Sequence, residues 1–175
     1  MSNTPITVVA TTNRKDSLSG QVAHHYTTLL AQQGCSSQLL SLTDLPADFT
    51  ATALYEHMGQ NADFNKLKEA MESAQKYVFV VPEYNGSFPG VFKAFIDGLP
   101  FPQTFKQKTC ALVGVSKGPQ GSVLAMSHLT DIFNYLGMHV LPRKLRLASI
   151  QDSQLSTILA NEYYVKQLHD QVSEI

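Results

Sequence analysis

The chain has 175 residues, 43% of them hydrophobic and 15% charged, which suffices for the core of one folded domain over residues 1–175 and excludes a disordered chain. A formal net charge of −1 without a dense Lys/Arg cluster argues against nucleic acid as a partner. No apolar run approaches the roughly 20 residues that span a bilayer, and the N-terminal residues do not resemble a secretion signal, so we expect no membrane association.

The two cysteines, Cys35 and Cys110, stand far apart without the spacing of a metal site or a redox pair. We expect free thiols in a reducing compartment, and therefore a cytoplasmic protein. The six histidines are scattered without the i, i+4 pairing of helical metal ligands, so no metal site is expected.

The first third of the chain predicts a strand, a helix and a second strand. Residues 6–10 form a short β-branched run, and apolar residues then recur at helical spacing over 22–30. Residues 38–42 predict the second strand, and Pro46 prevents its continuation. The irregular segment that follows, residues 43–62, could be a lid or a subunit contact.

The middle of the chain repeats the order of helix and strand. Good helix formers fill residues 64–74 and lead into an entirely apolar run at 77–81, which is typical of a strand buried on both faces. An apolar stripe predicts a helix over 91–99, and residues 110–115 predict another buried strand.

The C-terminal part predicts a helix around 129–136, a last strand interrupted between 138–141 and 145–148, and a final helix over about 153–172. Five strands thus alternate with five helices. This pattern predicts the α/β class, with a parallel sheet between two layers of helices and right-handed crossovers.

Three polar loops follow the first, third and fourth strands, at the edge of the sheet where ligands bind in such folds. The first, residues 11–19, offers four hydroxyls and two cations before a helix N-terminus, as expected of a phosphate site. Ordinary capping of that helix by Asp16 or Ser17 explains the same residues without a ligand.

The second loop contains Asn85-Gly86, where glycine permits a positive φ and lets a flat ligand approach the backbone, although a plain turn uses the same pair. The third loop, residues 114–121, has glycine where larger side chains would block a neighbour, but it could be a plain connection. A solvated surface lysine is the simpler interpretation of Lys117 within it.

Residues 82–90, Pro-Glu-Tyr-Asn-Gly-Ser-Phe-Pro-Gly, with Lys93 and Asp97 on the next helix, resemble the P-E-Y-N-x-S-x-P-G-x-L-K-N-x-x-D pattern of the NAD(P)H-dependent FMN reductase family. This family of the flavodoxin-like superfamily includes azoreductases and quinone or chromate reductases. The first loop resembles the family's G-S-x-R-x-x-S-x-N phosphate loop, with Thr11 and Ser19 in place of its glycine and asparagine.

The resemblance implies a flavodoxin-like doubly wound five-stranded parallel sheet in the order 2-1-3-4-5, with helices on both faces and FMN between strands one and three. It implies a phosphate site at Thr12, Arg14, Ser17 and Ser19. The isoalloxazine ring would lie along Pro82, Glu83, Tyr84, Asn85 and Gly86. The other side of the ring would be closed by Ser116, Lys117, Gly118 and Gly121.

The expected activity is that of an NAD(P)H-dependent flavin oxidoreductase. FMN would receive a hydride from NAD(P)H as co-substrate and pass electrons to a small-molecule electron acceptor, such as free flavin, a quinone, an azo compound or a metal oxyanion. No residue need act as an acid or base, and the chain shows no nucleophile constellation.

Two alternatives differ in class. A response-regulator domain shares the strand order, but it would need an acidic pair after the first strand, where this chain has Thr11-Thr12. A non-catalytic FMN-binding electron carrier would be more acidic and would flank the ring with aromatic residues, whereas this chain is near neutral and has no Trp.

We also expect a homodimer or homotetramer. The helix that carries Phe92, Phe95 and Ile96 has more large apolar groups than one sheet face obviously needs. The family resemblance implies the same.

Overall fold

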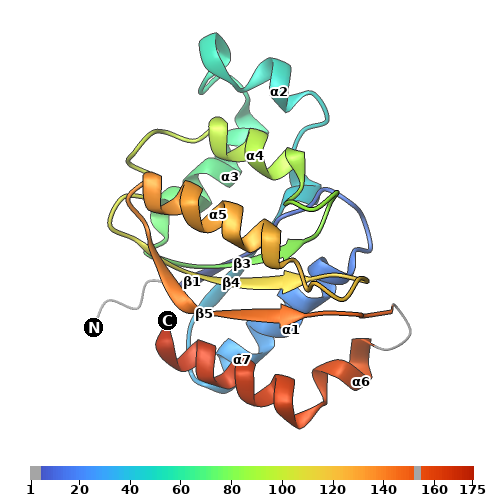
Figure 1. Ribbon diagram of the computed structural model, residues 1–175. Coiled ribbons are helices and arrows are strands. Elements are labelled where there is room, and N and C mark those ends of the chain that lie inside the picture. The colour runs from blue at the N-terminus through green and yellow to red at the C-terminus, as the bar shows by residue number, and fades with distance from the viewer. Residues whose placement is uncertain (1–4, 152–154) are drawn as a thin grey trace.

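The computed structural model describes residues 5–151 and 155–175. All strand pairs of its sheet are parallel, in the order β2-β1-β3-β4-β5, as predicted (Figure 1). The strands are β1 (Ile6–Ala10), β2 (Ser37–Ser41), β3 (Lys76–Pro82), β4 (Thr109–Val115) and β5 (His139–Leu147). Each predicted strand is confirmed to within two residues at either end.

Helices cover both faces of the sheet (Figure 1). On one face lie α1 (Leu18–Gln32), α6 (Leu155–Leu159) and α7 (Glu162–Glu174). On the other lie α3 (Ala62–Ser73), α4 (Gly90–Asp97) and α5 (Val123–Tyr135). Among the described residues, no helix has both the length and the apolar character needed to cross a bilayer.

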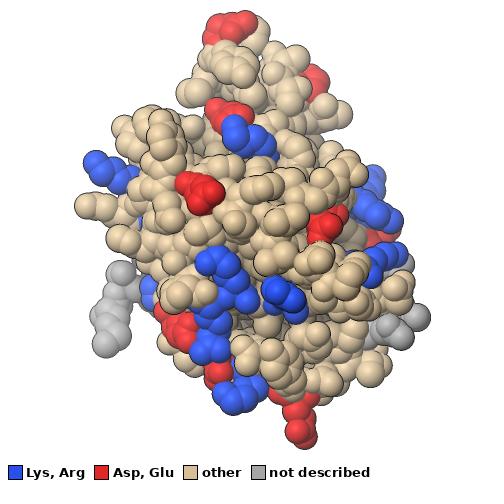
Figure 2. All heavy atoms as spheres, in the orientation of Figure 1, with Lys and Arg blue, Asp and Glu red and all other residues tan. Residues whose placement is uncertain are grey.

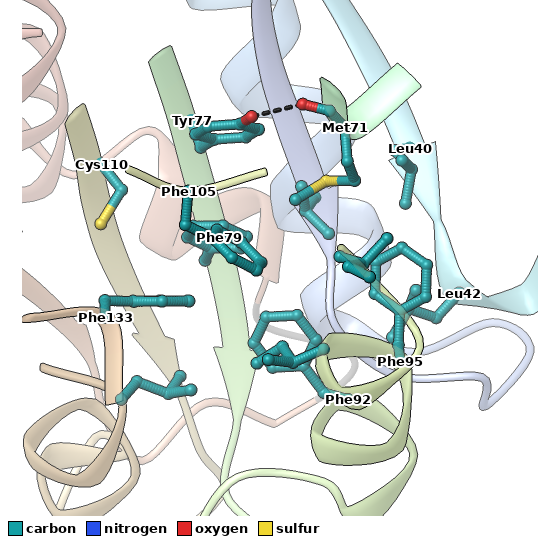
Figure 3. Close-up of a cluster of buried hydrophobic side chains, with 14 of the residues drawn as sticks. Leu40, Leu42, Met71, Tyr77, Phe79, Phe92, Phe95, Phe105, Cys110 and Phe133 are labelled. Carbon is teal, nitrogen blue, oxygen red and sulfur yellow. Dashed lines mark hydrogen bonds between the residues drawn. The ribbon is translucent and has the colours of Figure 1, made fainter. Parts of the chain in front are cut away.

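Two hydrophobic clusters, one on each face, form the core, because successive side chains of a strand point to opposite faces. Val78 and Val80 of β3 pack with α1, while Phe79 and Val81 pack with α4 and α5. Figure 3 shows the second cluster, where Phe79 stacks on Phe133 with ring centroids 4.6 Å apart. In the same view the Tyr77 hydroxyl donates to the Met71 carbonyl at the end of α3.

The prediction of a single final helix over 153–172 is wrong. The chain forms α6 and then α7, and Ser153, where the prediction began, lies outside the described residues. The side chain of Asn161 accepts a hydrogen bond from the Tyr163 N–H at 3.0 Å and so starts a new helix. Asparagine prefers this N-cap position because its side chain satisfies an N–H that the helix leaves free.

The segment 43–62 contains α2 (Phe49–Thr52) and two 3-10 turns, η1 (Leu42–Asp44) and η2 (Tyr55–His57). It is anchored by Phe49, Ala53 and Leu54 in the core on the α3 side. In Figure 1, α2 lies at the far end of this helical layer, beyond α3 and α4.

The expectation that the helix α4 has apolar groups to spare for a dimer contact is wrong. Phe92 and Phe95 are fully buried within the chain and Ile96 is 6% exposed, so the large apolar groups of α4 are used by the core of the single chain.

The predicted interruption of the last strand is wrong, because β5 runs continuously over His139–Leu147; the irregularity lies in its pairing with β4. The β4–β5 register shifts between the pairs Cys110–Val140 and Leu112–Lys144. The buried side chain of Gln171 on α7 donates to the Leu112 carbonyl at 3.1 Å and to the Arg143 carbonyl at 3.0 Å. The amide of one side chain thus donates hydrogen bonds to two backbone carbonyls beside the register shift of the sheet.

Candidate functional site

The loops after β1, β3 and β4 meet at the carboxyl edge of the sheet, around a cavity of about 380 Å³. Such a volume lies within the usual range for small-molecule sites, roughly 300–1,000 Å³. The lining includes most residues expected to bind the cofactor, namely Arg14, Ser17, Ser19, Pro82, Glu83, Tyr84, Ser116, Lys117 and Gly118. It also includes residues that the sequence did not single out as ligands: Asp16, Leu18, Gln21 and Val115.

Four expected site residues are not part of this lining: Thr12, Asn85, Gly86 and Gly121. Thr12 and Gly121 are held by contacts that shape the loops, whereas Asn85 and Gly86 form the tip of a turn.

The first loop is held in place by two buried threonines. Thr11 donates from both its backbone N–H and its hydroxyl to the Val80 carbonyl of β3, at 3.2 and 2.9 Å. The Thr12 hydroxyl lies 2.9 Å from the Tyr84 hydroxyl and accepts from the Arg14 N–H at 3.2 Å. The first and second loops are therefore joined behind the cavity wall, and the backbone of Arg14 is fixed at its rim.

The N-terminus of α1 faces the cavity through Ser17, which caps the helix. The Ser17 hydroxyl accepts from the Gly20 N–H at 3.1 Å and from the Ser19 hydroxyl at 3.4 Å. The capping interpretation is thus confirmed, and phosphate binding at the same helix end stays a prediction. Both interpretations use the same property of a helix N-terminus, which exposes N–H groups and a partial positive charge.

The second loop makes a tight turn at Asn85-Gly86. Both residues have positive φ, 52° and 74°, and the turn is closed by two backbone hydrogen bonds between Tyr84 and Ser87, 2.8 and 3.0 Å long. Positive φ at both central residues is the geometry that favours the Asn-Gly pair. The turn interpretation is confirmed, and the sequence had anticipated the positive φ of the glycine but not that of Asn85.

A contact between this turn and the helix α5 was not predicted. The Ser87 hydroxyl lies 2.9 Å from Nδ1 of His128. No spacing rule links two residues 41 positions apart, so only the fold could reveal the contact.

The third loop folds back on itself through Ser116. Its hydroxyl donates to the Gly118 carbonyl at 2.7 Å and accepts from the Gly121 N–H at 3.0 Å. A Cβ on Gly114 would clash with the Gly121 carbonyl and lie 2.8 Å from Cε of Met126. The expectation that glycine avoids a clash is confirmed at Gly114 and at Gly121, whereas Gly118 borders open space.

Cations and carboxylates both line the cavity. Arg14 and Lys117 are the cations, and Asp16 and Glu83 are the carboxylates. The loop after β1 and the start of α1 contribute hydroxyls, a guanidinium and the Asp16 carboxylate, whereas the ends of β3 and β4 contribute Pro82, Glu83, Tyr84 and Val115. The first group offers donors for an anion, and Pro82 and Tyr84 offer surface against which a planar ring can pack.

A model of the NADPH-dependent FMN reductase family matches residues 4–152. The chain belongs to this family. A 2-hydroxy-1,4-benzoquinone reductase from a Burkholderia species is 32% identical over 138 residues, which are 75% of this chain and 70% of the relative. An NAD(P)H-dependent FMN reductase of Pseudomonas aeruginosa is 31% identical over 114 residues, 61% of this chain and 62% of the relative.

Among solved structures, an NADH:FMN oxidoreductase in its apo form superposes with a TM-score of 0.80 at 21% identity, covering 97% of this FMN reductase chain and 87% of the neighbour. At that identity the likeness bears on the fold alone, and it confirms the flavodoxin-like architecture. The expected NAD(P)H-dependent flavin oxidoreductase activity, with FMN as cofactor and NAD(P)H as electron donor, is confirmed by the family.

The residues of this FMN reductase fit the cofactor. The cavity joins a helix N-terminus with hydroxyls, where a phosphate can be bound, to a wall of Pro82 and Tyr84, along which a flat ring can lie. Gly118 in the lining borders open space, because a Cβ built there would have no neighbour within 4 Å. Among residues 5–151 and 155–175, no three His, Cys, Asp or Glu side chains gather as a metal site.

Proposed function

We propose that this FMN reductase holds FMN in the cavity between its three loops and catalyses NAD(P)H + H⁺ + acceptor → NAD(P)⁺ + reduced acceptor. The observation that carries the proposal is the convergence of all three loops around a single cavity of about 380 Å³. When bound, FMN supplies the redox chemistry, since it can take up a hydride and deliver two electrons. The protein binds and orients it.

The phosphate of FMN would be bound by Arg14, Ser17 and Ser19 at the start of α1, with Thr12 holding the loop from behind. The guanidinium and the helix end both favour an anion, and a charge-assisted hydrogen bond is about twice as strong as a neutral one.

The ring would lie against the β3–α4 loop, Pro82 to Gly86, with Tyr84 in the wall. Ser116, Lys117 and Gly118 would close the other side, and Gly121 would act indirectly, by letting the loop pack on Arg146 of β5. A donor such as the Lys117 ammonium, if it lies near the pyrimidine edge of the flavin, would stabilise the negative charge of the reduced ring.

A quinone is the acceptor we favour. The Burkholderia relative, which is 32% identical to this chain, is named for reduction of a hydroxylated benzoquinone. A quinone takes up the same two electrons and two protons that the reaction delivers, and a planar quinone can occupy the site that the nicotinamide vacates.

A spectroscopic titration tests the proposal. The protein reconstituted with FMN should bleach at 450 nm when mixed with NADPH or NADH without oxygen, and regain its colour when a benzoquinone is added. A bound flavin that neither nicotinamide bleaches would leave only the electron-carrier function.

Arg14→Ala tests the phosphate site, and Lys15→Ala is its matched control. Lys15 is the next cation in the same exposed loop, but it does not line the cavity. Arg14→Ala should weaken FMN binding on the order of tenfold, the loss of one charge-assisted contact of about 1.4 kcal/mol. Equal losses in the two variants would place the phosphate elsewhere.

We further propose a homodimer formed through the groove between α4 and α5; a homotetramer would pair two such dimers. The groove, about 540 Å³ in volume, is bordered by Phe101 and Tyr135, which stack with centroids 6.1 Å apart and are 62% and 79% exposed. Most of the face in front of α4 and α5 is uncharged in Figure 2, and the charged residues that line the groove are Lys93, Asp97 and Asp131. A second copy is the simplest partner for such a surface, since symmetric dimers use one patch twice.

Sedimentation of Tyr135→Glu should show a monomer. Tyr163→Glu, at a 65% exposed tyrosine on α7, should leave the dimer intact. A monomeric wild-type protein at micromolar concentration contradicts the dimer. The use of NAD(P)H and the two free thiols, Cys35 and Cys110, support a cytoplasmic location.

A further inference from the structure

The turn after β3, residues 84–87, is held at both ends by side-chain contacts. At one end the Tyr84 hydroxyl lies 2.9 Å from the Thr12 hydroxyl of the first loop. At the other end the Ser87 hydroxyl lies 2.9 Å from Nδ1 of His128 on α5. Neither Ser87 nor His128 lines the flavin cavity, so this second contact supports the cavity wall from outside.

The tip of the turn presents two backbone donors. Within residues 5–151 and 155–175, no backbone carbonyl accepts a hydrogen bond from the N–H of Asn85 or Gly86. The positive φ of both residues fixes the directions of these two N–H groups relative to the rest of the turn. Where the donors point therefore depends on how the whole turn is oriented against its neighbours.

Helix α5 is a firmly packed support for the turn. Leu129, next to His128, is fully buried, and Phe133 one turn later stacks on Phe79 of β3. Figure 1 shows α5 on the same face of the sheet as α4, the helix into which the turn leads. Because α5 begins directly after the third loop, the contact of His128 links the second loop to the helix that follows the third.

A support of this kind can act on a cofactor without touching it. Binding groups are precise only when a surrounding layer of packing and hydrogen bonds fixes their positions. Donors aimed at a ring that becomes negatively charged stabilise its reduced form more than its oxidised form. A turn that loses its orientation should therefore weaken the binding of reduced FMN more than the binding of oxidised FMN.

We propose that His128 is a positioning residue, which holds the turn after β3 against α5 through the Ser87 hydroxyl and so raises the preference of the site for reduced FMN. The hydroxyl can donate to a neutral imidazole and accept from a protonated one, so the contact needs no fixed charge on the histidine. The inference rests on the proposed function, since it assumes that FMN lies along this turn.

His128→Ala removes the contact, and Ser127→Ala is its matched control. Both residues are exposed on α5, and alanine is the better helix former at either position, so the helix should stay folded. The midpoint potentials of bound and free FMN give the ratio of the affinities for reduced and oxidised FMN. In His128→Ala this ratio should fall about fivefold, as the loss of one ordinary hydrogen bond allows. In Ser127→Ala it should equal that of the wild type.

Two further variants test whether the effect passes through Ser87. Ser87→Ala should reproduce the loss, and the double variant with His128→Ala should lose no more than either single variant, because the two side chains form one contact. His128→Asn should restore most of the ratio, since asparagine has a polar δ atom where histidine has Nδ1. A general loss of stability would not be restored in this way.

Hydrogen exchange of the protein without FMN gives a second readout. The N–H groups of Tyr84 and Ser87 close the turn, so a loosened turn should exchange them faster. In His128→Ala and Ser87→Ala we expect this exchange to be about fivefold faster than in the wild type, with the amides of β3 unchanged. Ser127→Ala should exchange as the wild type does.

Three results would overturn the inference while leaving the oxidoreductase intact. They are an unchanged affinity ratio in both His128→Ala and Ser87→Ala, wild-type exchange at the turn in these two variants, and an equal loss in Ser127→Ala. A wild-type protein that binds no FMN refutes the proposed function and, with it, the effect on the affinity ratio. Faster exchange in His128→Ala would then still support its positioning of the turn.

Discussion

Gln171 offers a stability test whose size follows from the structure. Its side chain is fully buried and makes three hydrogen bonds: it accepts from the Tyr26 hydroxyl at 3.1 Å and donates to the Leu112 and Arg143 carbonyls. Gln171→Leu keeps the approximate volume but leaves these three groups without that partner. At about 1 kcal/mol for each, near the low end for a buried unsatisfied group, the loss is about 3 kcal/mol.

Thermal unfolding followed by circular dichroism measures this loss. For a domain of this size, about 3 kcal/mol corresponds to a fall in Tm of about 6–12 °C. Gln167→Leu is the control, because Gln167 lies one turn earlier on α7, is half-buried and accepts one bond from Arg143 at 3.1 Å; it should lose less than about 1 kcal/mol.

A double-mutant cycle with Tyr26→Phe shows whether the bonds act together. Because the tyrosine hydroxyl and the glutamine amide are partners, the two losses should add to more than the loss of the double variant. A Gln171→Leu protein within about 0.5 kcal/mol of wild type, the usual range of surface substitutions, would refute the importance assigned to this side chain.

Three further outcomes can be checked. Gly114→Ala should cost about 1–3 kcal/mol in urea unfolding, because its Cβ would press against the third loop, whereas Gly118→Ala should be near neutral; the reverse order would contradict the packing. A thiol reagent should modify the half-buried Cys35 and spare the buried Cys110 in the native protein, and labelling of Cys110 first would contradict its burial. Burial raises the pKa of the Cys110 thiol from 9.0 to about 12, so the unfolded chain ionises first and stability should fall as the pH rises above 9. The urea midpoint of Cys110→Ala should fall less over that range, and an equally steep fall would exclude the thiol as a cause.

The strands of the sheet could be predicted from their apolar pattern. Runs such as 77–81 and 110–115 are apolar at every position, and a strand of this kind needs cover on both faces. The strand order came from the family motif rather than from periodicity. The break between α6 and α7 was missed, because only the hydrogen bond from the Tyr163 N–H to the side chain of Asn161 reveals that Asn161 caps a new helix.

Which loops would form the site could be predicted, but the role of each residue could not. The residue types at Thr12, Ser17 and Gly121 are those that bind ligands and also those that hold loops together, and the sequence cannot separate the two uses. Their contacts with Tyr84, Gly20 and Arg146 show that they hold the loops together, whereas ligand binding by the same residues stays a prediction. The sequence did not predict that Gln21 lines the cavity, because a polar residue on a helix is equally typical of an exposed surface.

The cap at Ser17 has a consequence for how the cofactor comes and goes. In the free protein its hydroxyl already occupies the Gly20 N–H, so an arriving phosphate competes with a neighbour in the chain for that donor. The gain from binding is reduced by what the cap contributes, about 1 kcal/mol, and the helix end stays satisfied after the phosphate departs. The Ser17 cap thus keeps this N–H of α1 satisfied whether or not a phosphate is bound.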